Sequence, residues 1–317
     1  MDVHVSIVGP PSRTAVNMMA LLVYSLRRNG GALAEAPVTI TTNGAALPAA
    51  QREALRGLGV DTLRVLPRQP GSLYDDKFNA LYAVEAPYDV LVYLDTDIVV
   101  LDALDGLVEG LDPATATVRA RRVGPAGARA AGDYEAFVRE FAAGGGTALA
   151  ALQDDRFPHG YPLFNGGVAV WTRPAVKQVR ADALELSHSL YARRTRESLR
   201  TAAAMAREVW RRLRRRVLPD WGGPPRYECW MTEQMGIALA MLANDVAYEL
   251  LPPRFNWVHD HFPEAGTPPA LYHYMKGRHA IDRARLFSGD WQAAYADADA
   301  PSRRALARLA RDCAAVL

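Results

Sequence analysis

Cysteine is scarce in this chain, whose 317 residues include only Cys229 and Cys313. The two stand far apart and lack metal-ligand spacing, which argues against a disulfide framework and against a zinc site. No apolar run approaches the roughly 20 residues of a membrane span. The chain opens on a strand-like segment instead of a basic and then apolar leader. These absences predict a soluble, cytoplasmic protein.

An excess of charge of one sign is also missing. Lys and Arg total 37 against 35 Asp and Glu, for a net charge of +2, which argues against a general nucleic-acid binder. Half of the residues are hydrophobic. A chain of this size and composition can form one large α/β domain, or a domain with a subdomain.

The most informative stretch is DVLVYLDTDIVVL, residues 89–101. Val90–Leu94 is a short apolar run rich in β-branched and aromatic residues, which predicts a strand buried on both faces. The run ends at Asp95 and Asp97, and open α/β sheets bind ligands beyond the carboxyl ends of such strands. Two carboxylates there suit Mg²⁺ or Mn²⁺ carrying a phosphate. A pair of helix-capping acids is the alternative.

Strand and helix patterns alternate along the first part of the chain. The predicted strands are Val3–Val8, Val38–Thr42 and Val60–Leu66. One predicted helix ends at Asn29, before two glycines, and a second covers about Pro48–Leu58. This order predicts a parallel, right-handed, doubly wound sheet.

A further helix is predicted to open at Tyr74, with Lys77 in its first turn, where the helix dipole disfavours a cation. One explanation is that Asp75 and Asp76 neutralise the lysine. The other is that Lys77 and the helix end together hold an anion beside a metal bound by Asp95 and Asp97. The sequence leaves both explanations open.

Three later stretches have distinct patterns. Residues 119–155 are loosely patterned and predict a surface segment suited to a lid, with one helix near Tyr134–Phe141. The residue pattern of Tyr161–Trp171 again predicts a strand. Its paired glycines permit either a close approach of another group to the backbone or a β-bulge. Leu184–Val217 predicts a long helix that carries many arginines between Arg193 and Arg216. A solvated face is favoured there, and contact with anionic lipid or a phosphorylated acceptor is the alternative.

The last informative region contains a candidate ligand for phosphate or metal chemistry. Thr232 is a plausible cap for a helix over Glu233–Leu242. His273 follows a short apolar run and precedes Lys276 and Arg278. An imidazole can bind a metal, and the two cations can meet phosphate oxygens. Considered alone, His273 is more often a satisfied core histidine.

In this order, the motifs resemble the GT-A fold glycosyltransferases, in particular the glycogenin-like and lipopolysaccharide-galactosyltransferase-like group. The ordered set runs from about Val3 to His279 and comprises Lys77, LDTD at 94–97, FNGGV at 164–168, Glu233-Gln234, Phe255-Asn256 and His273-Tyr274. The resemblance implies an α/β fold with one GT-A-like domain. Within it we expect a nucleotide-binding half over about 1–118, a donor and acceptor half over about 156–280, and a helical tail over 281–317.

The resemblance also implies roles for individual residues. Asp95, Asp97 and His273 would bind Mn²⁺ or Mg²⁺, which carries the diphosphate of a UDP- or GDP-sugar. The implied donor contacts are Lys77, Asp95, Asn165, Gly166, Gly167, Lys276 and Arg278. Glu233 and Gln234 would act at the reacting carbon of the sugar.

Two departures from the pattern of the group leave questions open. Glu233-Gln234 stands where the group has Asp-Gln, which leaves retention or inversion undecided. Gly277 falls one residue late, without the usual Lys-Pro-Trp, so either Lys276 or Arg278 can grip the diphosphate. An inverting enzyme needs a carboxylate base, Glu233 or Glu228, whereas a retaining one needs a stabilising group such as Gln234 under the sugar carbon.

The predicted function is therefore metal-dependent transfer of a sugar from a nucleoside-diphosphate sugar to an unknown acceptor. A sugar-nucleotide mutase or hydrolase on the same scaffold is the first alternative, because it would use the same metal site. A haloacid-dehalogenase-type phosphatase, with Asp95 as the nucleophile, is the second. That family normally carries the motif at the start of its fold, and only Gly289-Asp290 approximates its later Gly-Asp.

Overall fold

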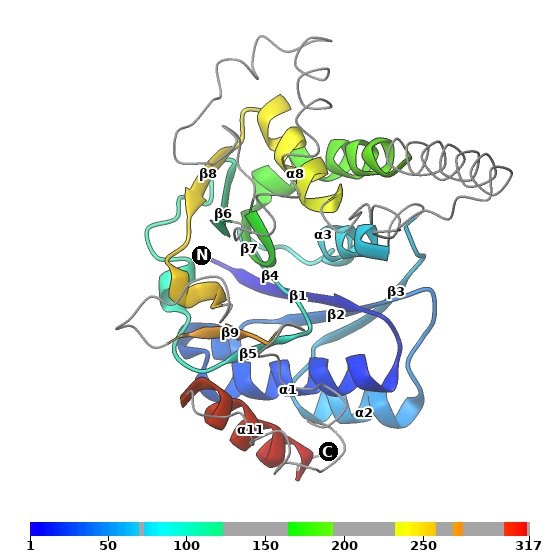
Figure 1. Ribbon diagram of the computed structural model, residues 1–317, viewed down its shortest axis with the longest axis vertical. Helices are drawn as coiled ribbons and strands as arrows, with labels where there is room; N and C mark the ends of the chain where they lie inside the picture. Colours follow the sequence, from blue (N-terminus) through cyan, green and yellow to red (C-terminus); the bar gives the residue numbers. More distant parts are fainter. Residues whose placement is uncertain (70–72, 123–163, 193–231, 258–268, 275–300, 316–317) are drawn as a thin grey trace, which may run out of the picture.

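A seven-stranded, mostly parallel sheet forms the centre of the molecule, and helices cover both of its faces (Figure 1). This computed structural model describes residues 1–69, 73–122, 164–192, 232–257, 269–274 and 301–315. The strand order is β3-β2-β1-β4-β7-β6-β8. The predicted α/β class is confirmed.

The first four strands are parallel, as the alternating pattern predicts. They are β1 (Val3–Gly9), β2 (Val38–Asn43), β3 (Thr62–Leu66) and β4 (Val90–Leu94). Every residue of β4 is buried, as expected for an unbroken apolar run. Because β2 and β4 lie on opposite sides of β1, the winding of the sheet reverses between β1 and β4. Such a reversal opens a ligand crevice at the carboxyl ends of the strands.

The other half of the sheet begins with an antiparallel strand. β7 (Phe164–Thr172) pairs with β4, with Val168 opposite Leu94. β6 (Thr117–Arg122) and β8 (Ala247–Leu250) complete the sheet. Because β7 runs against β4, its first residues lie at the edge where β4 ends. The Asp95 amide accordingly donates to the Gly167 carbonyl at 2.8 Å.

A separate two-stranded sheet joins two distant parts of the chain. β5 (Ile98–Val100) pairs antiparallel with β9 (Leu271–His273), and Ile98 lies opposite His273. The backbone of Asp97 also takes part, because its carbonyl accepts from the Tyr274 amide at 3.0 Å. This pairing brings His273 to the end of β4.

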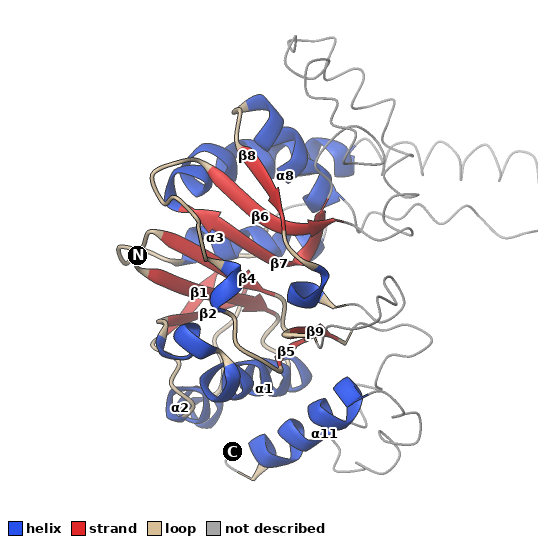
Figure 2. Cartoon of the chain, turned by 90° about the vertical axis from the view of Figure 1, so that its left-hand side faces the viewer, coloured by secondary structure: helices blue, strands red, loops and turns tan. Residues whose placement is uncertain are grey.

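The helices form a layer on each face of the sheet (Figure 2). One layer contains α1 (Arg13–Asn29) and α2 (Ala49–Gly57), with α11 (Pro301–Ala314) outside α1. The other contains α3 (Asn79–Ala83), helical residues 173–192 and α8 (Thr232–Ala243).

The short 3₁₀ helices are η1 (Gly31–Glu35), η2 (Leu73–Phe78), η3 (Asp105–Leu107) and η5 (Pro253–Asn256). None of the helices in the described ranges combines the length and apolar character of a membrane-spanning segment.

Two helices were predicted with the wrong starting point. The helix expected from Tyr74 is the 3₁₀ helix η2, and α-helical geometry begins only at Asn79. The Asp76 carboxylate contributes to this, because it accepts from the Gln69 amide at 2.7 Å and so ties the segment to the preceding loop. The helix expected from Leu184 already begins at residue 173, directly after β7. Pro174 lies in its first turn, where the missing N–H loses no hydrogen bond.

Several predicted features lie outside the described residues. They are residues 123–155 of the candidate lid segment with its helix near Tyr134–Phe141, the arginines between Arg193 and Arg216, Glu228, and the two cations Lys276 and Arg278. The expectation of a loosely patterned surface segment was wrong for residues 119–122, because they belong to β6 of the central sheet.

Candidate functional site

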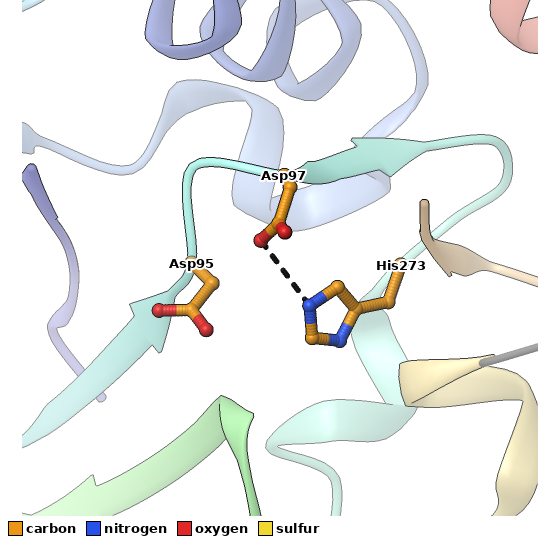
Figure 3. Close-up of side chains that lie close together, drawn as sticks. All are labelled: Asp95, Asp97 and His273. Carbon is orange, nitrogen blue, oxygen red and sulfur yellow. Dashed lines mark hydrogen bonds and ion pairs between the residues drawn. The ribbon is translucent and has the colours of Figure 1, made fainter. Parts of the chain in front are cut away.

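Asp95, Asp97 and His273 converge at the carboxyl end of β4 (Figure 3). Each offers one potential ligand atom, and these atoms all lie within 4.8 Å of one another. His273 Nε2 is 3.2 Å from Asp97 Oδ1. Two carboxylates and an imidazole form an oxygen and nitrogen donor set that suits Mn²⁺, and the carboxylates also suit Mg²⁺. The residues present therefore fit a divalent cation.

Asp95 is held from two sides. Lys77 Nζ donates to its Oδ2 at 2.8 Å, and the Tyr93 hydroxyl donates to its Oδ1. Tyr93 lies two residues before Asp95, so both side chains project from the same face of the chain. A carboxylate has about four lone-pair positions, so Asp95 keeps acceptor capacity for a cation. Sequence reasoning missed Tyr93, although its spacing from Asp95 was the available signal.

The charge of Lys77 is stabilised by the acids around it. Burial acts to lower its pKa, but the carboxylates of Asp95 and Glu233 outweigh this, and the net pKa lies above the ordinary lysine value. Its side chain remains 27% exposed. Burial, together with the charge of Asp95, raises the pKa of Tyr93 well above its ordinary value. Lys77 is thus a persistent cation, whereas Tyr93 is a neutral donor.

The structure changes the explanation of Lys77. The Asp76 carboxylate faces the Gln69 amide and lies 3.4 Å from Arg68 Nη1, while Lys77 pairs with Asp95. The side chain of Asp75 lies outside the described residues. Lys77 precedes α3 and is not in its first turn, and that helix has five residues. The end of α3 therefore takes no part in an anion site at Lys77.

The first residues of β7 approach the cluster closely. A Cβ at Gly167 would lie 2.4 Å from His273 Cε1, whereas one at Gly166 would lie 3.4 Å from Gln234 Nε2. Close approach to the backbone is therefore the reason for glycine at position 167. The β6–β7 register also shifts between Ala120 and Arg122, opposite this end of β7. Both explanations of the paired glycines thus apply.

Glu233 and Gln234 lie in the first turn of α8 and are 2% and 6% exposed. Gln234 Nε2 is 3.5 Å from Glu233 Oε1. Both line a cavity whose other polar walls are Lys77 and Tyr93, and whose inner walls are apolar. The structure therefore brings the predicted catalytic pair and the predicted donor lysine to one cavity beside Asp95.

His273 is supported by an asparagine to which sequence reasoning gave no role. His273 Nδ1 is 3.0 Å from Asn256 Oδ1, and Asn256 Nδ2 donates to Asn165 Oδ1 at 3.0 Å. The signal was present, because Phe255-Asn256 belongs to the ordered motif set. Asn165, expected to line the donor pocket, directs its side-chain oxygen toward Asn256 and the Gly167 amide.

Comparisons with known proteins identify relatives of this fold. A profile described as the Rhodobacterales glycosyltransferase domain matches residues 5–212. Among solved structures, an active-site mutant of LgtC is 16% identical, with a TM-score of 0.52 and coverage of 98% of this chain and 96% of that chain. The galactosyltransferase LgtC in complex with donor and acceptor sugar analogues has the same identity and coverage, with a TM-score of 0.48.

The bifunctional glycosyltransferase WbbM in its apo form is 15% identical, with a TM-score of 0.50. The alignment covers 97% of this chain but 51% of WbbM. No match was found among curated proteins. At these identities the structural likeness concerns the fold, and it confirms the GT-A arrangement predicted from the motifs.

The profile match provides the family as well as the fold. It covers more than half of the chain, from β1 past the described helical residues 173–192 to residue 212, which lies outside the described residues. Lys77, the two clustered acids and the glycines of β7 all lie within it. The chain belongs to the Rhodobacterales glycosyltransferase domain family and is a glycosyltransferase of the GT-A fold.

Proposed function

We propose that this glycosyltransferase takes its sugar from a nucleoside-diphosphate sugar, with uridine or guanosine as the nucleoside, and that it depends on Mn²⁺ or Mg²⁺. The observation that carries the proposal is the convergence of Asp95, Asp97 and His273 within 4.8 Å. This cluster lies at the carboxyl end of β4, where the sheet reverses its winding, and such a position favours ligand binding.

Asp95, Asp97 and His273 are the residues that would hold the cation. When bound, a divalent cation would offset the negative charge that develops on the departing diphosphate. The two aspartates contribute the negative charge of the site, and the buried imidazole contributes a neutral nitrogen ligand.

Lys77 is proposed to bind the phosphates or the sugar of the donor. Its ammonium is held at 2.8 Å from Asp95, and its raised pKa keeps it charged. A fixed cation in a partly buried site binds a phosphate oxygen more strongly than a solvated one does. Lys276 and Arg278, which lie outside the described residues, remain candidates for binding the diphosphate.

Glu233 and Gln234 are proposed to act at the reacting carbon. Cleavage of a glycosyl–phosphate bond develops positive charge on the sugar. In an inverting reaction the Glu233 carboxylate would accept the proton of the acceptor hydroxyl. In a retaining reaction Gln234 would stabilise the charge from below the ring. Gly166 lies against the end of the Gln234 side chain, and both line the cavity beside Asp95.

Two alternatives use some of the same residues. A sugar-nucleotide mutase or hydrolase would differ only in the group that attacks the sugar carbon. A phosphatase with Asp95 as the nucleophile has less support, because Asp95 follows β4 in the middle of the sheet and the family is one of glycosyltransferases.

Product analysis tests the proposal. The protein is incubated with a panel of UDP- and GDP-sugars and Mn²⁺, with and without candidate acceptors, and the products are separated by mass. We expect release of the nucleoside diphosphate that stops in excess chelator. Calorimetry should show nucleoside-diphosphate binding that strengthens with Mn²⁺. Full turnover in chelator, or no binding of either diphosphate, would refute the proposal, and an isomerised or free sugar would favour the mutase or the hydrolase.

A further inference from the structure

The imidazole of His273 lies at the end of a chain of hydrogen bonds that starts at a backbone amide. The Gly167 N–H donates to Asn165 Oδ1 at 3.0 Å. Asn256 Nδ2 donates to the same oxygen at 3.0 Å. Asn256 Oδ1 is then 3.0 Å from His273 Nδ1. Each hydrogen bond determines whether the next atom in the chain acts as a donor or as an acceptor.

The backbone amide fixes the direction of the whole chain. Because a backbone N–H can only donate, the Asn165 atom that faces Gly167 must be the carbonyl oxygen. That oxygen can only accept, so Asn256 must turn its NH₂ group toward Asn165 and its oxygen toward His273. Asparagine oxygen and nitrogen are otherwise hard to tell apart. His273 must therefore donate from Nδ1, which leaves the Nε2 lone pair free in the neutral ring.

The free lone pair points at the acids of the cluster. Nε2 is 3.2 Å from Asp97 Oδ1, as the dashed line in Figure 3 marks. In the neutral ring both atoms are acceptors, and two acceptors at this distance repel each other unless a proton or a cation lies between them. The tautomer therefore directs His273 toward the place where the ligand atoms of Asp95 and Asp97 also converge.

Packing prevents the ring from turning to another arrangement. A Cβ at Gly167 would lie 2.6 Å from His273 Nδ1 as well as 2.4 Å from Cε1, so the ring lies directly against the β7 backbone. His273 is 4% exposed and Asn256 is fully buried. The Asn256 carbonyl also accepts from Arg121 Nη1, which holds its backbone in place. Solvent does not reach the amide that faces the imidazole.

We propose that Asn256, itself oriented by Asn165, is a positioning residue that sets the His273 tautomer so that Nε2 faces a divalent cation. The part concerning the cation rests on the metal-dependent function proposed above. The part concerning the tautomer stands on the hydrogen bonds alone. Groups that hold the second nitrogen of a metal-binding histidine commonly change metal affinity about 10- to 100-fold when they are removed.

Nitrogen NMR of the metal-free, full-length protein tests the tautomer. With ¹⁵N-labelled histidine, at a pH where the ring is neutral, we expect His273 to carry its proton on Nδ1. The signal is assigned by its loss in His273→Gln. In Asn256→Ala we expect the Nδ1–H form to lose its preference. A proton on Nε2 in the unsubstituted protein would overturn the inference, whatever the metal affinity.

Calorimetry with Mn²⁺ alone tests the consequence for the cation. We expect Asn256→Ala to weaken Mn²⁺ binding about 10- to 100-fold, and Asn165→Ala to weaken it less. Asn256→Asp keeps an oxygen for Nδ1–H but loses the donor to Asn165 Oδ1, so its loss of affinity should be smaller than that of Asn256→Ala. The matched control is Asn29→Ala, which removes an amide that donates to the Val100 carbonyl at 2.8 Å, away from the cluster. Its Mn²⁺ affinity should not change.

Thermal melting establishes which variants are folded. A folded Asn256→Ala protein with unchanged Mn²⁺ affinity would overturn the inference. If that variant does not fold, unchanged affinity in Asn165→Ala would do the same. If the unsubstituted protein binds no Mn²⁺, the metal-dependent function fails together with the cation part of the inference, and the NMR experiment separately decides the tautomer.

Discussion

Gly167 lies directly against the Cε1 and Nδ1 atoms of the His273 imidazole. No side chain fits between them, because a Cβ on residue 167 would lie 2.4 Å from His273 Cε1. The neighbouring Gly166 is different, since its Cβ would lie 3.4 Å from the end of the Gln234 side chain. One glycine of the pair is thus required by the candidate metal ligand, and the other has room for a methyl group.

The pair provides a matched test. Gly167→Ala should displace the His273 ring and lower Mn²⁺ affinity by about 10-fold or more, because a metal site tolerates only about 0.5 Å of ligand displacement. Gly166→Ala should leave Mn²⁺ affinity unchanged. Calorimetry on both variants makes the comparison. Equal affinities in the two variants would contradict the contact between Gly167 and His273.

Lys77 should affect the donor and the cation in opposite directions. Lys77→Met should weaken nucleotide-sugar binding by about 1.5–3 kcal/mol, the range for hydrogen bonds to charged groups. Mn²⁺ alone should bind at least as tightly as before, because the variant removes an ammonium that lies 2.8 Å from Asp95. Lys177→Met, on an exposed position of the helix after β7, is the control. An unaltered donor affinity in Lys77→Met would remove Lys77 from the site.

Asp97 should be required for metal binding and turnover. Asp97→Ala removes one of two carboxylates from the cluster, so we expect Mn²⁺ affinity to fall by at least about 10-fold and turnover to fall with it. Asp102→Ala is the control, because that acid lies just after β5 in an exposed ion pair with Arg254. Calorimetry and turnover with and without chelator test this. Asp97→Ala with the affinity of the unsubstituted protein would contradict the proposed site.

Substitution of Glu233 should lower the turnover rate without changing the affinity for the metal. Glu233→Gln keeps the shape of the side chain and removes its charge, so kcat should fall by about 10²- to 10⁴-fold if the carboxylate takes the acceptor proton. Mn²⁺ affinity should stay the same. NMR of the product anomer then assigns the role, since inversion requires such a base. An unchanged kcat would exclude Glu233 as the base.

Cys313 should be unreactive in the folded protein. It is 2% exposed, and burial raises the pKa of its thiol to about 11. Because the folded pKa is the higher one, the thiol contributes stability below about pH 8.5, the ordinary cysteine value, which is lost as the pH rises toward the folded pKa. Alkylation at neutral pH, followed by peptide mass spectrometry, should label Cys313 only after denaturation. Labelling of the native protein at the rate of the denatured chain would contradict this.

The strands of the first half could be predicted from the sequence because their signal is local. An apolar run such as Val90–Leu94 indicates its own burial, and the alternation of such runs with helical stripes limits the sheet to parallel connections. The acids that end the run could be recognised for the same reason. Where a side chain changed the local geometry, as Asp76 does through its bond to the Gln69 amide, the prediction of an α-helix was wrong.

Other parts of the site depended on distant residues. Local patterns suggested Asp75 and Asp76 as the partners of Lys77. They could not indicate its ion pair with Asp95, because Asp95 reaches Lys77 only after β4 has packed into the sheet. His273, considered alone, is more often a buried core residue than a ligand. Its position beside Asp97 follows from the pairing of β5 with β9, and pairing between distant segments is not encoded in the period of either one.

The sequence alone therefore determined the buried strand, the two acids that follow it and the order of motifs that indicates a glycosyltransferase. Only the tertiary structure decided which groups surround them. Lys77 and Tyr93 donate hydrogen bonds to Asp95. His273 is oriented by the chain of hydrogen bonds through Gly167, Asn165 and Asn256. The physical reason is one of range. Burial and backbone propensity act over a few neighbouring residues, whereas the direction of a side-chain hydrogen bond depends on atoms that only folding brings within 3 Å of one another.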